Sequence, residues 1–139
     1  MTLQENNIFL RPLEDRDINN IYTSWFADAS VTKFLEARNI SVEDSLEYLK
    51  KGKETGLYYI FAICHSSTNL HIGNIKIGPI KRKEGISDLV TVIGDKNYWG
   101  KGIASIAIKK AVDLGFKQAG LRKFSASINS LNIGSINAY

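Results

Sequence analysis

A glycine-containing turn between two apolar segments has the residue types and spacing best suited to chemistry. Trp99-Gly100-Lys101-Gly102-Ile103-Ala104-Ser105 follows a short apolar run and leads into a segment with helical periodicity. The first-turn N–H groups of a helix have no partners within the helix and lie at the positive end of its dipole, so they bind anions. Gly100, Gly102 and Ala104 allow a pyrophosphate to approach these amides, and Lys101 adds positive charge. The turn therefore predicts a phosphate-binding site.

Two other phosphate-binding motifs fit this turn poorly. The sequence contains no G-x-x-x-x-G-K-[ST] pattern, and Gly100 to Ser105 completes only part of a dinucleotide-binding fingerprint, because Ser105 stands where the third small residue belongs. Glycines in a strand-to-helix turn also serve backbone geometry alone. A structural role thus remains the alternative for the turn taken by itself.

The elements that must position this turn follow the order β-α-α-β-β-β-α-β, which predicts an α/β (α+β) fold. Apolar residues at helical spacing predict a helix from Asp15 and a long one from Ile103, and Ser41 predicts the N-cap of a helix that ends near Gly56. Dense or alternating apolar runs predict the strands, at 8–10, 57–64, 72–80, 89–93 and 123–129.

Length and charge limit the classes of function. The 139 residues suffice for one domain, and the net charge of +4 from 18 Lys plus Arg against 14 Asp plus Glu is modest. The run Lys81-Arg82-Lys83 is followed by an acidic residue and is interpreted as a solvated hairpin tip, so nucleic-acid binding is not expected.

Cysteine and histidine usage predicts neither a disulfide nor a metal site. Cys64 is the sole cysteine and lies in an apolar run, which indicates a buried thiol, while His65 and His71 show no ligand spacing. The N-terminal residues lack the pattern of a signal peptide, and no apolar run reaches transmembrane length. We therefore expect a cytoplasmic protein that does not bind membranes.

The turn and its surroundings resemble the GNAT N-acetyltransferase superfamily, particularly the branch that includes ribosomal-protein N-terminal acetyltransferases. The superfamily motif [Q/R]-x-x-G-x-[G/A] falls on Trp99 to Ala104, with Trp99 in the Gln/Arg position, as in the W-G-K-G-[YI]-A variant of this branch. Ile106 stands where the branch commonly has Glu. Leu10-Arg11-Pro12-Leu13 and Trp25-Phe26-Ala27-Asp28 are similar to the family's opening strand and first helix.

The resemblance implies the GNAT fold with a mixed central sheet, acetyl-CoA as cosubstrate, and a single GNAT domain over residues 1–139, and no metal is expected. The segment from Asn132 to Tyr139 is similar to a family segment whose Asn contacts the pantetheine arm and whose Tyr protonates the departing thiolate. The family fold continues with a helix and two strands beyond this point. The resemblance therefore implies that residues 1–139 lack the C-terminal part of the family fold, which leaves an open edge at the fifth strand. We expect either that residues 1–139 are part of a longer chain or that a homodimer or strand pairing with a neighbour covers this edge.

The implied reaction is direct attack of a neutral amine on the acetyl thioester. On the family pattern, Val92, Ile93 and Gly94 bind the pantetheine arm through their main chain. Asp88 is the first candidate for the general base, with Glu84 and His71 as substitutes, and Tyr139 is the candidate acid.

The sequence leaves three alternatives open. The acceptor is either a protein N-terminal amine or a small amine such as a nucleotide-linked aminosugar. A degenerate GNAT module that binds acyl-CoA without catalysis is the second function considered. A nucleotide-binding regulatory domain is the third, and it requires that ATP or NAD stabilise the fold.

Overall fold

The computed structural model describes residues 4–32, 40–118, 120–121 and 123–128. Five strands in these ranges form one mixed sheet in the order β1-β2-β3-β4-β5, in which β1 to β4 are antiparallel and β5 runs parallel to β4. The strands are β1 (Ile8–Pro12), β2 (Tyr59–His65), β3 (His71–Lys81), β4 (Ile86–Ile93) and β5 (Lys123–Ile128). The helices are α1 (Asn20–Ala27), α2 (Ala29–Thr32), α3 (Val42–Thr55) and α4 (Ile103–Gln118).

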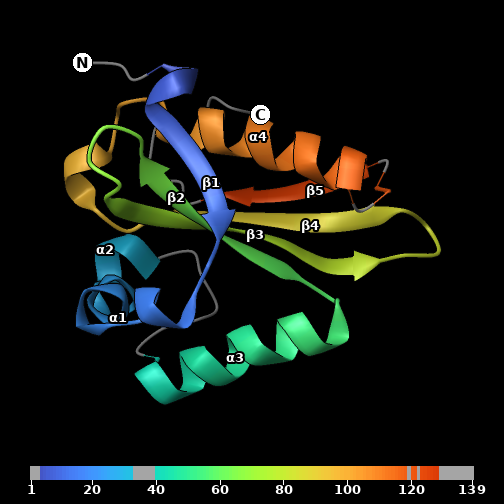
Figure 1. Ribbon diagram of the computed structural model, residues 1–139, viewed down its shortest axis with the longest axis horizontal. Coiled ribbons are helices and arrows are strands. Elements are labelled where there is room, and N and C mark those ends of the chain that lie inside the picture. The colour runs from blue at the N-terminus through green and yellow to red at the C-terminus, as the bar shows by residue number, and fades with distance from the viewer. Residues whose placement is uncertain (1–3, 33–39, 119, 122, 129–139) are drawn as a thin grey trace.

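The sheet separates two helical layers. Helix α4 covers one face, and α1, α2 and α3 lie on the other (Figure 1). Ile75, Leu89 and Ile93 belong to a buried cluster with α4 residues such as Ile103, whereas Trp25 and other α1 residues pack in a second cluster on the opposite face. Complete burial of such side chains stabilises the fold by about 1.5–3 kcal/mol each.

The N-terminal helical region differs from the sequence prediction. Asp15–Asp17 form a 3-10 helix, and α1 begins only at Asn20, because the Asn19 side chain accepts the N–H groups of Ile21 and Tyr22 and so caps a new helix. The prediction of a helix starting at Asp15 was therefore wrong in its start. The predicted caps of α3 are confirmed, since the Ser41 hydroxyl accepts the Asp44 N–H and Gly56 adopts φ 67°.

A bulge in β3 sets which side chains share a face. Gly73 pairs with Ile63 and His71 pairs with Cys64, so Ile72 is an extra residue in β3. Its carbonyl accepts the N–H groups of both Gly94 and Asp95, at 3.0 and 3.1 Å, where β4 ends. The extra residue turns His71 onto the same face as Asn74, toward α1.

Two further expectations concern the buried thiol and the membrane. Cys64 is fully buried, as predicted from its apolar surroundings. No helix of the described chain has the length and hydropathy that a membrane span requires.

Candidate functional site

The predicted phosphate-binding turn connects β4 to α4. Asp95 opens it: its side chain accepts the Asn97 N–H at 3.0 Å and its carbonyl accepts the Tyr98 N–H at 3.0 Å, which folds residues 96–98 into a 3-10 helix. Gly100 and Gly102 then adopt φ 76° and 77°, values that L side chains rarely take. After these two left-handed residues, α4 begins at Ile103.

The geometry of the turn fits an anionic ligand. A Cβ at Gly100 would have no heavy atom within 4 Å, so backbone conformation and not crowding requires glycine there, and the space beside it is open. Helix α4 makes its first bond from the Ile106 N–H to the Gly102 carbonyl, which leaves the N–H groups of Ile103 and Ala104 without acceptors in the helix. Lys101 is half-buried beside them. The residues present thus offer amide donors and one positive charge to an anionic group.

The end of β4 presents main-chain groups next to this turn. The Gly94 N–H points to Ile72 of β3, and since successive residues of a strand alternate, the N–H and C=O of Ile93 point to the β5 side. The Trp99 indole N–H donates to that Ile93 carbonyl at 2.8 Å. Trp99 occupies the Gln/Arg position of the motif, and Gln and Arg also carry N–H donors. The turn is therefore fastened to the strand that precedes it.

Helix α1 closes over the same strand end. A Cβ added at Gly94 would lie 2.0 Å from Cδ2 of Trp25, so only glycine permits this contact between α1 and the end of β4. Lys96 of the turn also forms an ion pair with Asp28, at 2.7 Å, and the Asp28 side chain accepts the Ser30 N–H at the start of α2. The turn is thereby linked to both α1 and α2.

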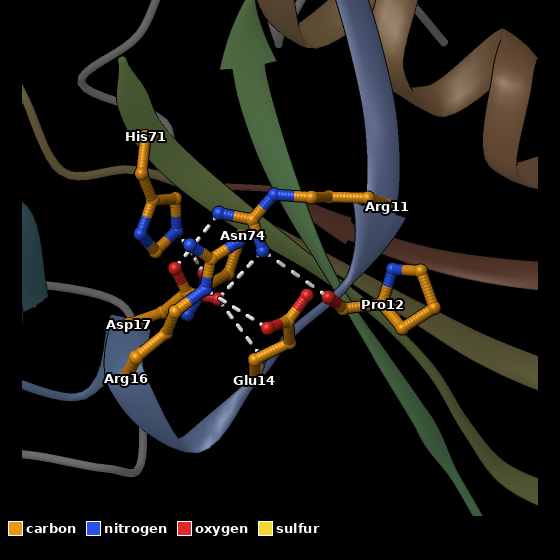
Figure 2. A network of polar contacts seen from close by, with 7 residues as sticks. All are labelled: Arg11, Pro12, Glu14, Arg16, Asp17, His71 and Asn74. Carbon is orange, nitrogen blue, oxygen red and sulfur yellow. Dashed lines mark hydrogen bonds and ion pairs between the residues drawn. The ribbon is translucent and has the colours of Figure 1, made fainter. Parts of the chain in front are cut away.

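A partly buried polar network joins β1 to the 3-10 helix of residues 15–17 (Figure 2). Arg11 of β1 forms a two-pronged ion pair with Asp17, at 2.7 and 2.8 Å, and Asp17 also accepts the Glu14 N–H. Burial by itself would raise the pKa of Asp17, but these hydrogen bonds and the Arg11 charge outweigh it and lower the pKa. The same pairing raises the pKa of Arg11. This network fixes the 3-10 helix against the first strand.

His71 faces this network from β3. Its Nε2 lies 2.8 Å from Oδ1 of Asn74, whose amide donates to the Tyr22 hydroxyl at 3.0 Å, and its ring meets the Trp25 ring edge-on at a centroid distance of 5.0 Å. Burial lowers the pKa of His71 and raises that of Tyr22 to about 12. Since Asn74 uses its amide as the donor to Tyr22, Nε2 carries the proton of a neutral imidazole.

The structure separates the three candidates for the base. Asp88 lies exposed on β4, and its side chain shares a face with Val90 and Val92, the face of α1 and α3. Glu84 lies in the turn between β3 and β4, and His71 lies at the opposite end of the sheet, packed under α1. The fold therefore does not bring these three groups together, and Asp88 is the one on β4 itself.

The remaining predicted residues divide into two groups. Val92, Ile93 and Gly94 adjoin the turn of Trp99, Gly100, Lys101, Gly102, Ile103, Ala104 and Ser105. Asn132 and Tyr139 lie outside the described residues. In the described ranges, no group of three or more His, Cys, Asp and Glu side chains is arranged to hold a metal ion.

Sequence reasoning missed Asp17, Trp25 and Lys96. The Arg11–Asp17 pair joins residues six apart through a 3-10 helix that the sequence did not predict. Trp25 was assigned to the buried stripe of a helix, which is correct, but its contact with Gly94 spans nearly seventy positions. A glycine following a buried strand is the one local signal that could have suggested a close approach.

Comparisons with known proteins agree with this geometry. The model of the acetyltransferase (GNAT) domain family matches residues 7–139. The uncharacterized N-acetyltransferase p20 of Bacillus licheniformis is 27% identical over 139 residues, which cover 97% of this chain and 77% of the relative. The probable N-acetyltransferase YjcK of Bacillus subtilis (strain 168) is 26% identical over an alignment of 147 residues, gaps included, which covers 96% of this chain and 78% of the relative.

Among solved structures, a spermidine N-acetyltransferase from Vibrio cholerae in complex with CoA and spermine superposes with a TM-score of 0.82 at 18% identity, covering 96% of this chain and 78% of the other. A dodecameric structure of spermidine N-acetyltransferase from Vibrio cholerae in an intermediate state gives a TM-score of 0.69 at 20% identity, with 87% and 69% covered. These two similarities establish the shared fold.

Proposed function

Because the chain belongs to the acetyltransferase (GNAT) domain family and is an N-acetyltransferase, we propose that it transfers the acetyl group of acetyl-CoA to a primary amine of a protein N-terminus or of a small amine or aminosugar. The observation that carries this proposal is the pair of left-handed glycines at the start of α4, Gly100 and Gly102, with open space beside Gly100.

The cofactor-binding residues are assigned from this turn outward. The N–H groups of the first turn of α4, with Lys101, hold the pyrophosphate. The pantetheine arm binds along Val92, Ile93 and Gly94, where the Ile93 N–H, which points away from β3, is the main-chain donor, because the Gly94 N–H already donates to Ile72. Asn132 completes the pantetheine site.

In the reaction, the lone pair of the amine nitrogen forms the new C–N bond to the acetyl carbon and the C–S bond breaks. Asp88 accepts the proton that the amine must lose, directly or through water, and Tyr139 donates a proton to the departing sulfur. The backbone around Ile93 holds the thioester carbonyl for attack.

Three finer assignments accompany this function. The W-G-K-G-I-A variant of the motif favours the branch of ribosomal-protein N-terminal acetyltransferases. The buried Cys64 thiol suits a reducing cytoplasm. The position of β5 at the edge of the described sheet suits pairing with a second copy, and residues 1–139 act as one GNAT domain.

Two matched glycine variants test the cofactor site. Gly100 and Gly120 have φ 76° and 67°, and a Cβ at either position would contact nothing within 4 Å. Ala at either position therefore costs a similar strain of about 1–2 kcal/mol, but only Gly100→Ala places a methyl beside the first turn of α4. We expect Gly100→Ala to weaken acetyl-CoA binding at least about tenfold by calorimetry, while Gly120→Ala binds like the wild type. Equal affinities in the two variants would refute the site.

Ligand comparison and turnover complete the test. Acetyl-CoA and CoA should raise the melting temperature of the wild type, whereas ATP and NAD should not. Thiol release from acetyl-CoA should then depend on an added amine. Binding without turnover for every amine offered would favour a degenerate acyl-CoA-binding module over a transferase.

A further inference from the structure

Two tyrosines hold a lysine on the sheet face that α1 and α3 cover. Lys76 of β3 donates to the Tyr48 hydroxyl at 3.1 Å, and its Nζ lies 5.6 and 6.0 Å from the ring centroids of Tyr48 and Tyr58. The two rings stack at 4.4 Å with an angle of 16°. The ammonium group is therefore positioned by hydrogen bonding and by attraction to both rings.

The register of the sheet places this lysine beside the reacting strand. Lys76 is directly opposite Val90 of β4, and Asn74, two residues earlier on the same face, is opposite Val92. Asn74 donates to Tyr22 of α1, whereas Lys76 contacts α3. Lys76 thus lies between the parts of this face that α1 and α3 cover.

The β4 side chains on this face become more exposed from Val92 toward Asp88. Of the β4 side chains on this face, Val92 is buried, Val90 is half-buried and Asp88 is exposed. Helix α4 covers the opposite face of the sheet (Figure 1). Val90 and Asp88 lie on the face of α1 and α3, so in this inference the acceptor reaches β4 from that face.

The charges on this stretch are of opposite sign. Asp88 lies two residues before Val90, the strand partner of Lys76, at the point where the β3–β4 pairing is interrupted after Ile77. No carboxylate in the described ranges forms an ion pair with Lys76. The face therefore offers a carboxylate to an amine and, one strand away, a fixed ammonium that repels a second cation.

We propose that the acceptor is an amine that also carries an anionic group, a carboxylate or a phosphate a few bonds from the nitrogen, with the anion bound by Lys76 and the amine placed at Asp88. This inference rests on the proposed acetyl transfer. It distinguishes the chain from an enzyme for polyamines, because a polyamine brings further positive charge to Lys76.

The test compares acceptors in the wild type and in charge variants. Thiol release is measured with spermidine, a neutral monoamine, an α-amino acid and an aminosugar phosphate. We expect kcat/KM to be highest for one of the two anion-bearing amines, and the winner tells whether carboxylate or phosphate is the natural group. Preference for spermidine overturns the inference but leaves acetyl transfer standing.

Lys76→Met tests the residue itself, and Lys51→Met is its control, since Lys51 is an exposed lysine of α3 and its loss changes the net charge equally. Lys76→Met should lower the ratio of kcat/KM for the anionic amine to that for the monoamine about tenfold, through KM. Lys76→Arg should restore most of the ratio, and Lys51→Met should leave it unchanged. An unaltered ratio in Lys76→Met refutes the assignment.

A binding measurement separates the inference from the chemistry. Calorimetric titration of the same amines into the CoA-saturated protein should rank them in the same order, with Lys76→Met weakening only those with an anion. If acetyl-CoA binds and no amine is acetylated, the proposed transferase function fails. Selective binding of an anionic amine in that case would still support Lys76, and its absence would refute it.

Discussion

Trp99, at the first position of the acetyl-CoA motif, has a structural role. Its indole N–H donates to the Ile93 carbonyl at 2.8 Å, and the ring packs against both buried clusters, so one side chain joins the turn to the end of β4. Because the adjacent main chain is assigned to the pantetheine arm, this contact connects the two halves of the proposed cofactor site.

Trp99→Phe keeps an aromatic ring but removes the donor. We expect a loss of about 1–3 kcal/mol in the free energy of unfolding, since the partly buried carbonyl of Ile93 loses its side-chain partner. Urea denaturation measures this loss. Tyr98→Phe, in the same turn, removes a hydroxyl and should change stability by less than about 0.5 kcal/mol. Equal stability of the two variants would contradict the role given to the indole.

At the scale of elements, α1 packs against the end of β4 through the contact of Trp25 with Gly94. The indole occupies the space that a Cβ at position 94 would need, and the ion pair of Asp28 with Lys96 links the same helix end to the turn. Helix α1, on the proposed acceptor side, is therefore in direct contact with the end of β4 and with the turn that is proposed to bind the cofactor.

Gly94→Ala should disturb both elements. The added methyl would overlap Trp25, and overpacking of this kind costs about 1–3 kcal/mol. Thermal unfolding of Gly94→Ala, Trp25→Leu and the double variant forms a cycle, and the smaller side chain should relieve part of the cost of the methyl. Strict additivity of the two changes would show that the contact does not limit position 94.

At the scale of the whole molecule, the free energy of unfolding should fall in two separate pH ranges as the solution is acidified. The pKa of His71 is lowered by burial from its ordinary 6.5, so the unfolded chain takes up that proton first and stability falls as the pH drops below 6.5. Asp17 is buried too, but the hydrogen bonds from Arg11 and Glu14 set its pKa below the ordinary 3.8, so its contribution persists above that value and is lost as the pH falls further.

Urea midpoints measured between pH 8 and pH 3 test this pH dependence. His71→Gln should flatten the decline that begins near pH 6.5 and leave the decline at lower pH, whereas Asp17→Asn should do the reverse. The latter variant should also lose about 1.5–3 kcal/mol at pH 7, where the charged hydrogen bonds are complete. A wild-type profile that is flat between pH 8 and pH 5 would contradict the role of His71.

Local signals in the sequence determined the elements and the cofactor turn. Ser41 and Gly56 predicted the ends of α3, and the glycines at 100 and 102 predicted the start of α4, because caps and left-handed turns depend on residues within a few positions. The mixed α/β fold followed from the same periodicities and from the family resemblance, and the sheet order confirms it.

Tertiary structure decided which side chains meet. The extra residue Ile72 places His71 beside Asn74, and the strand register sets Lys76 against Val90, although no spacing in the sequence shows either. Such contacts depend on a bulge and on pairing between distant strands, where a shift of one residue exchanges the two faces. The sequence by itself therefore determined where acetyl-CoA is expected, and the register of β3 against β4 decided which charges face the acceptor.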